Sequence, residues 1–161
     1  MSTVFRKATD GDLPAVLALY RSVLGTEGCT WDEDYPSERE AKGDLSSGGL
    51  YVFESDGKLI GAISVLSGEE FDDLAGWRGE SGGSCELSRL AVATEEQGKG
   101  RAKTVAREAL KEARKKGYTS ARLLVSKVNL AAVGLYRSLG FDFVGECHKY
   151  GIDFFACEKI L

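Results

Sequence analysis

The stretch CELSRLAVATEEQGKGRAKTVAREALKEARKK, residues 85–116, decides how this chain folds. Residues 85–93 predict a strand, and residues 101–116 have the apolar spacing of an amphipathic helix. Between them lies a glycine loop, QGKGRA, at residues 97–102. Glycines let a backbone approach a ligand closely, and the unpaired amides and dipole of a first helical turn favour negative charge. The stretch therefore predicts a pyrophosphate site, and with it a nucleotide-bearing cofactor.

The predicted pyrophosphate loop is of an unusual kind. A dinucleotide-binding fingerprint would need a third glycine where this chain has Lys103, and no Gly-Lys-Ser/Thr ending is present. A solvated turn is the alternative interpretation of a Gly-Lys-Gly sequence before a helix. The candidate cofactor-binding residues of the loop are Gln97, Gly98, Lys99, Gly100, Arg101 and Ala102.

Length and composition favour one compact domain spanning residues 1–161, of which 43% are hydrophobic. The net charge of −4 gives no general attraction to nucleic acid or to an anionic membrane, so we expect neither as a partner. No apolar stretch is long enough to span a membrane, and residues 1–12 lack the apolar core of a secretion signal, so we expect a cytoplasmic protein. The four cysteines lack CxxC spacing, which favours buried thiols and no metal site.

Hydrophobic periodicity and turn residues predict a mixed α/β (α+β) sheet with one right-handed crossover that contains the glycine loop. Residues 67–84 predict a long loop, and residues 26–36 predict either a lid or a plain connector. The predicted strands are residues 3–7, 50–54, 58–66, 85–93, 120–126, 141–147 and 152–159, and the predicted helices are residues 10–24, 101–116, 130–139 and a short one after Ser37.

In this arrangement the chain resembles the GCN5-related N-acetyltransferase (GNAT) superfamily over nearly its full length. Residues 97–102 fit that family's Gln/Arg-x-x-Gly-x-Gly/Ala motif, and LYRSLGF at residues 135–141 fits its Leu-Tyr-x-x-x-Gly-Phe segment. Leu90-Ala91-Val92 ends the strand before the loop, and Asn129 opens the helix after the next strand. The resemblance implies a mixed, mostly antiparallel sheet of about seven strands, about four flanking helices and a splayed central pair of parallel strands.

The resemblance also implies acetyl-CoA as the cofactor and acetyl transfer to an amine, without a metal. The loop amides would hold the pyrophosphate, and the pantetheine arm would pair with the backbone of Leu90, Ala91 and Val92. The amide of Val92 would polarise the thioester carbonyl. Asn129 would contact the cofactor arm.

Two residues carry the implied proton transfers. Tyr136 would protonate the leaving thiolate, since a phenol keeps its proton at neutral pH; the alternative is a structural tyrosine packed on the sheet. Glu86 is the candidate base, because it shares a strand face with Ser88 and Leu90. The alternatives are an exposed Glu86, a Glu86 paired with Arg89 or Arg122, or loss of the acceptor's proton to water.

The expected acceptor is a primary amine of a small molecule or a peptide. Relatives that acetylate ribosomal-protein N-termini carry a glutamate where this chain has Leu124, which argues against that subclass. The acidic and aromatic residues 31–35, together with Glu69, Glu70, Asp72 and Asp73, would attract a cationic amine. A non-catalytic acyl-CoA-binding module or sensor is the alternative function. The C-terminal strands make a homodimer possible, although pairing within the chain would explain their apolar character equally well.

Overall fold

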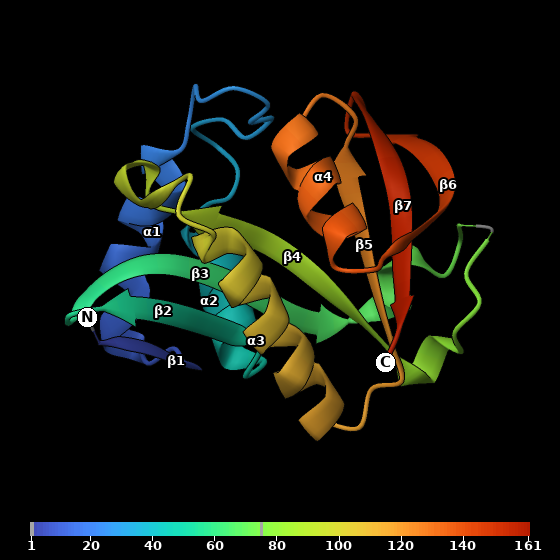
Figure 1. Cartoon of the computed structure of the whole chain (residues 1–161), viewed down its shortest axis with the longest axis horizontal. Coiled ribbons are helices and arrows are strands. Elements are labelled where there is room, and N and C mark those ends of the chain that lie inside the picture. The colour runs from blue at the N-terminus through green and yellow to red at the C-terminus, as the bar shows by residue number, and fades with distance from the viewer. Residues whose placement is uncertain (1, 75) are drawn as a thin grey trace.

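A computed structural model describes residues 2–74 and 76–161 and shows one seven-stranded mixed sheet (Figure 1). The strand order is β1-β2-β3-β4-β5-β7-β6, and only the β4–β5 pair is parallel. The strands are β1 (Thr3–Lys7), β2 (Leu50–Ser55), β3 (Lys58–Ser67), β4 (Ser84–Val92), β5 (Ser120–Ser126), β6 (Asp142–Lys149) and β7 (Ile152–Ile160). This topology confirms the predicted fold class.

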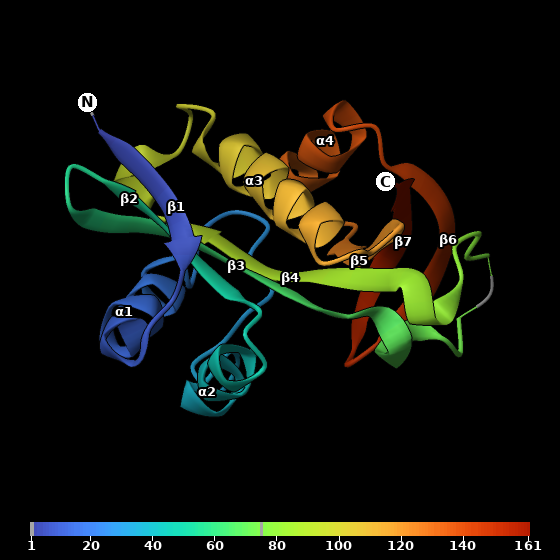
Figure 2. The ribbon, with the colours of Figure 1, turned by 90° about the horizontal axis from the view of Figure 1, so that it is seen from below.

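Among the described residues four helices cover the sheet, two on each face (Figure 2). They are α1 (Leu13–Ser22), α2 (Glu38–Ser46), α3 (Arg101–Lys115) and α4 (Leu130–Ser138). Helices α1 and α2 lie on one face, and α3 and α4 lie on the other. The stripe Val105, Ala109 and Ala113 of α3 is fully buried on β3 and β4, as its helical spacing predicts. No helix among the described residues is long and apolar enough to cross a membrane.

Local sequence signals set several element boundaries. Ser37 and Glu40 form a capping box at the start of α2, the short helix that was predicted after Ser37. The predicted helix over residues 10–24 is too long: it divides into a 3-10 turn, Asp10–Asp12, followed by α1. The Asp12 carboxylate accepts the Thr9 amide at 2.7 Å, which caps the turn three residues before the α-helix begins.

The parallel pair formed by β4 and β5 is very short. Its ladder joins residues 84–86 of β4 to residues 120–122 of β5, and the two strands then diverge (Figure 1). Against β3, strand β4 has one extra residue, because Ser64 pairs with Ser88 while Ala62 pairs with Ala91. Arg89, within this bulge, adopts a positive φ of 52°. The predicted splay is therefore present, and the second half of β4 has no strand partner on the β5 side.

Two buried charged side chains, Arg122 and Glu158, form hydrogen bonds to the predicted loop between β3 and β4. It contains two 3-10 turns, η2 (Gly68–Phe71) and η3 (Ser81–Gly83). Arg122 donates to the carbonyls of Gly68 and Gly79, each at 3.1 Å. Glu158 accepts the amides of Arg78 and Gly79, each at 2.8 Å. These bonds fix the loop on the face of the sheet that carries α1 and α2.

The C-terminal strands pair within the chain. Strand β7 lies between β5 and β6, so its apolar residues are covered without a second subunit. Strand β6 forms the outer edge of the sheet. Cys85 and Cys157 are buried as predicted, whereas Cys29 and Cys147 are partly exposed.

Candidate active site

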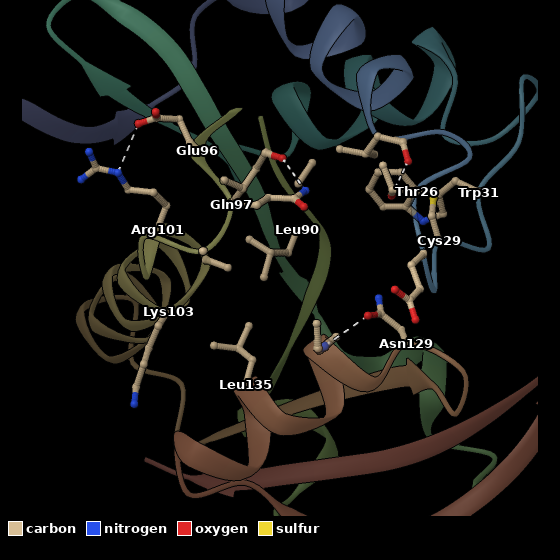
Figure 3. Close-up of a pocket in the computed structure, with 18 of the residues that line it drawn as sticks. Thr26, Cys29, Trp31, Leu90, Glu96, Gln97, Arg101, Lys103, Asn129 and Leu135 are labelled. Carbon is tan, nitrogen blue, oxygen red and sulfur yellow. Dashed lines mark hydrogen bonds and ion pairs between the residues drawn. The ribbon is translucent and has the colours of Figure 1, made fainter. Parts of the chain in front are cut away.

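A cavity of about 500 Å³ opens where β4 and β5 diverge (Figure 3). Its walls come from the second half of β4, the first turn of α3, one side of α4 and the loop after α1. The fold thus brings together most of the predicted cofactor-binding residues, which line this cavity: Leu90, Ala91, Val92, Gln97, Gly98, Gly100, Arg101, Ala102 and Asn129.

The glycine loop takes a conformation that needs glycine. Gly98 has φ 81° and Gly100, the N-cap of α3, has φ 76°. No atom lies within 4 Å of a Cβ built on either residue, so backbone conformation, and not space, selects glycine here. The first-turn amides of α3 have no acceptors within the helix and lie at the cavity wall. The arrangement is suited to an anion.

The basic side chains of the loop differ in their surroundings. Lys99 pairs with Glu96 at 2.9 Å and does not line the cavity in the described part of the chain. Arg101 lines the cavity and also pairs with Glu96, at 3.4 Å. Lys103, which follows the motif, reaches the cavity wall as well (Figure 3). A phosphate at this end of the cavity would therefore meet Arg101 and Lys103 together with the helix amides.

The open edge of β4 presents backbone polar groups to the cavity. The amide of Ala93 donates to the Ile60 carbonyl of β3 at 2.8 Å. Since successive residues of a strand turn their amides to opposite sides, the Val92 amide faces away from β3. The Val92 carbonyl accepts from the Gln97 side chain at 3.3 Å, which ties the first motif residue to the strand before it.

Asn129 lies at the opposite end of the cavity from Arg101 (Figure 3). It is the N-cap of α4, and its side-chain oxygen accepts the Ala132 amide at 3.2 Å. Gly28, in the loop after α1, approaches so closely that a Cβ there would lie 2.9 Å from the Asn129 Cα. The loop therefore abuts the start of α4 and closes one side of the cavity.

Sequence reasoning gave residues 31–35 of this loop a part in attracting the amine, but it did not assign Thr26 or Cys29 as ligand contacts. Thr26, Cys29 and Trp31 line the cavity opposite α3 (Figure 3). Trp31 packs edge to face on Tyr20 of α1, with ring centroids 5.5 Å apart. The aromatic and acidic composition of residues 26–36 was the available signal. The structure agrees with part of each interpretation, because Trp31 lines the cavity and also packs against the core.

Tyr136 is buried close to the cavity. It is 7% exposed, and its ring packs edge to face on Phe141 at 5.5 Å. Ala132, one helical turn earlier, and Leu135 line the cavity, whereas Tyr136 is not among the described residues that do so. Burial raises the pKa of the phenol far above its ordinary value. Tyr136 thus keeps its proton, behind the wall that its neighbours form.

Glu86 lies at the last rung of the parallel ladder and is 7% exposed. Its Oε1 atom has no hydrogen-bond partner among the described residues. Burial, and next the charge of Glu70, raise the pKa of Glu86 to about 7. The alternative interpretations of an exposed Glu86, or one paired with Arg89 or Arg122, are wrong. The side chain is buried, and neither arginine forms an ion pair with it.

Arg89 belongs to a network that sequence reasoning missed. Its Nε and Nη2 atoms donate to the Asp44 carboxylate of α2 at 2.8 and 2.7 Å. Its Nη1 atom donates to the Tyr35 hydroxyl at 2.9 Å, and the Ser64 hydroxyl donates to Asp44. This network ties the bulge of β4 to α2 and to the loop before it.

Comparisons with known proteins agree with this architecture. The acetyltransferase (GNAT) family model matches residues 16–141. The N-acetyltransferase YjgM of Escherichia coli is 30% identical over 151 residues, covering 89% of this chain and 84% of its own. An L-methionine sulfoximine/L-methionine sulfone acetyltransferase of Pseudomonas aeruginosa is 28% identical, covering 96% and 88%. Rat N-acetyltransferase 8 is 35% identical over 98 residues, which cover 61% of this chain and only 41% of the rat protein.

A solved structure shares the fold over nearly the whole chain. The GNAT-family acetyltransferase of Streptococcus agalactiae superposes with a TM-score of 0.83 at 23% identity, covering 99% of this chain and 95% of that one. The family match spans the strand, the glycine loop and the two helices that build the cavity. The chain belongs to the acetyltransferase (GNAT) family.

Proposed function

We propose that this protein is an acetyl-CoA-dependent N-acetyltransferase that acetylates a primary amine of a small molecule by direct attack on the thioester. The observation that carries the proposal is the cavity itself. It runs from a glycine loop at a helix N-terminus along a strand edge that lacks a partner. A long ligand with an anionic end and an amide-bearing arm fits such a cavity.

The residues present fit the cofactor at both ends. Arg101, Lys103 and the first-turn amides of α3 would hold the pyrophosphate, and the backbone of residues 90–92 would pair with the pantetheine arm. When bound, acetyl-CoA supplies an acetyl group activated as a thioester. The Val92 amide, which faces away from β3, would donate to the carbonyl oxygen of that group.

Two buried groups would move protons, although neither is among the described residues that line the cavity. Glu86, whose pKa burial raises to about 7, would accept a proton from the acceptor ammonium. Tyr136, whose raised pKa keeps the phenol protonated, would supply a proton to the leaving sulfur. The two groups come from opposite sides of the splay, since Glu86 is on β4 and Tyr136 on α4.

The test is thiol release from acetyl-CoA in the presence of a panel of polyamines, aminoglycosides, amino acids and short peptides, with acetyl-CoA binding measured separately by calorimetry. Release that depends on one acceptor class supports the proposal. An amino-acid acceptor is the class suggested by the name of the Pseudomonas aeruginosa relative. Binding of acetyl-CoA with no thiol release for any amine would contradict it and favour a non-catalytic acyl-CoA-binding module.

A further inference from the structure

Glu70 belongs to the η2 turn, which contacts β4, the strand that carries Glu86, on the face of the sheet with α1 and α2. Leu66 of β3 pairs with Glu86, and β3 continues directly into the η2 turn that contains Glu70. The turn packs on the start of β4, where a Cβ on Gly68 would lie 2.9 Å from the Ser84 carbonyl oxygen. Figure 2 shows this green turn beneath β4, on the side of α1 and α2. The charge of Glu70 acts on Glu86 strongly enough to raise its pKa.

The two arginines nearest Glu86 are already neutralised. Arg89 is held in a bidentate pair by Asp44, and its remaining nitrogen donates to a tyrosine hydroxyl. Arg122 pairs with Asp72 at 2.7 Å and donates to two carbonyls, and its guanidinium lies 4.9 Å from the centre of the Trp77 ring. Neither guanidinium has its charge available for an incoming carboxylate.

The two glutamates, in contrast, form no ion pair with any of the described residues. Glu70 is exposed and forms no hydrogen bond or ion pair with the described residues. Glu86 is buried with one oxygen unbonded. A buried carboxylate oxygen without a hydrogen-bond partner is unfavourable, so this position favours a ligand that brings a cation to it. Asp72 and Asp73, which the sequence grouped with Glu70, are instead occupied by Arg122 and Lys149.

Building on the N-acetyltransferase function proposed above, we infer that the acceptor is a small diamine, whose reacting ammonium lies at Glu86 and whose second ammonium lies at Glu70. An amino-acid acceptor would place its carboxylate beside two acidic side chains, and neither Arg89 nor Arg122 is available to bind it. In the reaction the N–C bond forms as the C–S bond breaks. The nitrogen loses two protons. One passes to Glu86 and on to water, Tyr136 gives its proton to the sulfur, and the second proton of the nitrogen then returns to the Tyr136 phenolate.

The experiment compares putrescine, butylamine and γ-aminobutyrate, which have equal chain lengths and differ only in the group at the far end. We expect kcat/KM for putrescine to exceed that for butylamine by about tenfold, with γ-aminobutyrate poorer still. Glu70→Gln should remove most of this advantage by raising the KM for putrescine. Glu69→Gln is the control, because it removes the same charge one residue away. If Glu70 binds the second ammonium at a defined position, only Glu70→Gln lowers kcat/KM for putrescine; if the acids attract the amine only through their overall charge, both variants lower it.

Several outcomes would overturn the inference. These are equal kcat/KM for putrescine and butylamine, a preference for γ-aminobutyrate, or the same loss in Glu69→Gln as in Glu70→Gln. In each of these the N-acetyltransferase function would stand. Calorimetry of putrescine with the CoA-loaded protein separates the two proposals. Binding that Glu70→Gln weakens, with no transfer to any amine, supports the diamine site and contradicts the catalytic function. No putrescine binding contradicts the site.

Discussion

Glu86 stands in register with Arg122 at the last rung of the β4–β5 ladder, and yet the two side chains form no ion pair. The Arg122 guanidinium turns to Asp72 and to the carbonyls of the η2–η3 segment. An arginine that could have neutralised Glu86 is thus used to hold a loop. The carboxylate keeps a raised pKa at the point where the strands separate, which is the property that a general base near neutral pH requires.

The first prediction concerns the pH dependence of turnover. We expect kcat/KM to rise with pH through an apparent pKa near 7, because the ionised form of Glu86 is the proton acceptor. Glu86→Gln should lower kcat/KM by about two orders of magnitude and abolish this limb of the profile. The measurement is a pH series of initial rates at low acceptor concentration. An unchanged profile in the variant would show that the base is another group or water.

The second prediction concerns stability. The folded chain holds a proton on Glu86 up to about pH 7, whereas the unfolded chain releases it near 4.5, the ordinary pKa of a glutamate. The folded state therefore binds more protons in this window, and its stability falls as pH rises through it. At about pH 8 the free energy of unfolding of the Glu86→Gln variant should exceed that of the wild type by about 2–3 kcal/mol. At about pH 4 the variant should be no more stable than the wild type. Denaturant melts at the two pH values provide the comparison.

A third prediction separates the acid role of Tyr136 from a packing role. Tyr136→Phe keeps the ring that packs on Phe141 and removes only the hydroxyl. We expect kcat to fall about a hundredfold while the acetyl-CoA dissociation constant changes little. Single-turnover rates together with calorimetry give the two values. Full activity in the variant would leave Tyr136 as a structural residue.

The glycine loop gives a fourth prediction. Gly100→Ala meets no neighbouring atom, but it places a side chain at φ 76°, which costs about 1 kcal/mol. Relaxing the loop to escape this strain would move the amides at the cavity, so acetyl-CoA affinity should fall about fivefold. Gly43→Ala in α2 is the matched control, since Gly43 also has open space but lacks a positive φ. It should stabilise the chain slightly and leave affinity unchanged.

A fifth prediction concerns the pair formed by Arg89 and Asp44, whose side chains are 13% and 6% exposed. Removing one partner leaves a buried charge, so Arg89→Met and Asp44→Asn should each cost about 3 kcal/mol of stability. Their effects on the pH profile should be opposite. Arg89 lowers the pKa of Glu86 and Asp44 raises it, so the midpoint moves up in Arg89→Met and down in Asp44→Asn. Midpoints that move together would show that the two act through structure and not through charge.

The fold was predictable from the sequence because its signals are local. The capping box at Ser37, the hairpin glycine Gly57 and the glycine loop each act within a few residues, and their order along the chain implies the mixed sheet. The start of the first helix was less predictable, because the cap formed by Thr9 and Asp12 makes residues 10–12 a separate turn, although these residues fit a helical pattern.

The surroundings of the candidate base were not predictable. Whether Glu86 is buried, and whether Arg89 or Arg122 neutralises it, depends on where α2 and the η2 turn place Asp44 and Asp72. Both contacts span more than forty residues, and no spacing rule connects them. The bulge at Arg89 likewise depends on the pairing of β4 with β3, which a single sequence does not specify.

Residues 87–92 of β4 form an unpaired strand edge that the fold keeps inside the molecule. On a surface, such an edge is a template for joining other chains and a common origin of aggregation. Here α4 and the loop after α1 stand where a second polypeptide would have to enter. The protein can therefore offer hydrogen-bonding groups to a slender, strand-like ligand while its own copies are kept from adding to the sheet at that position.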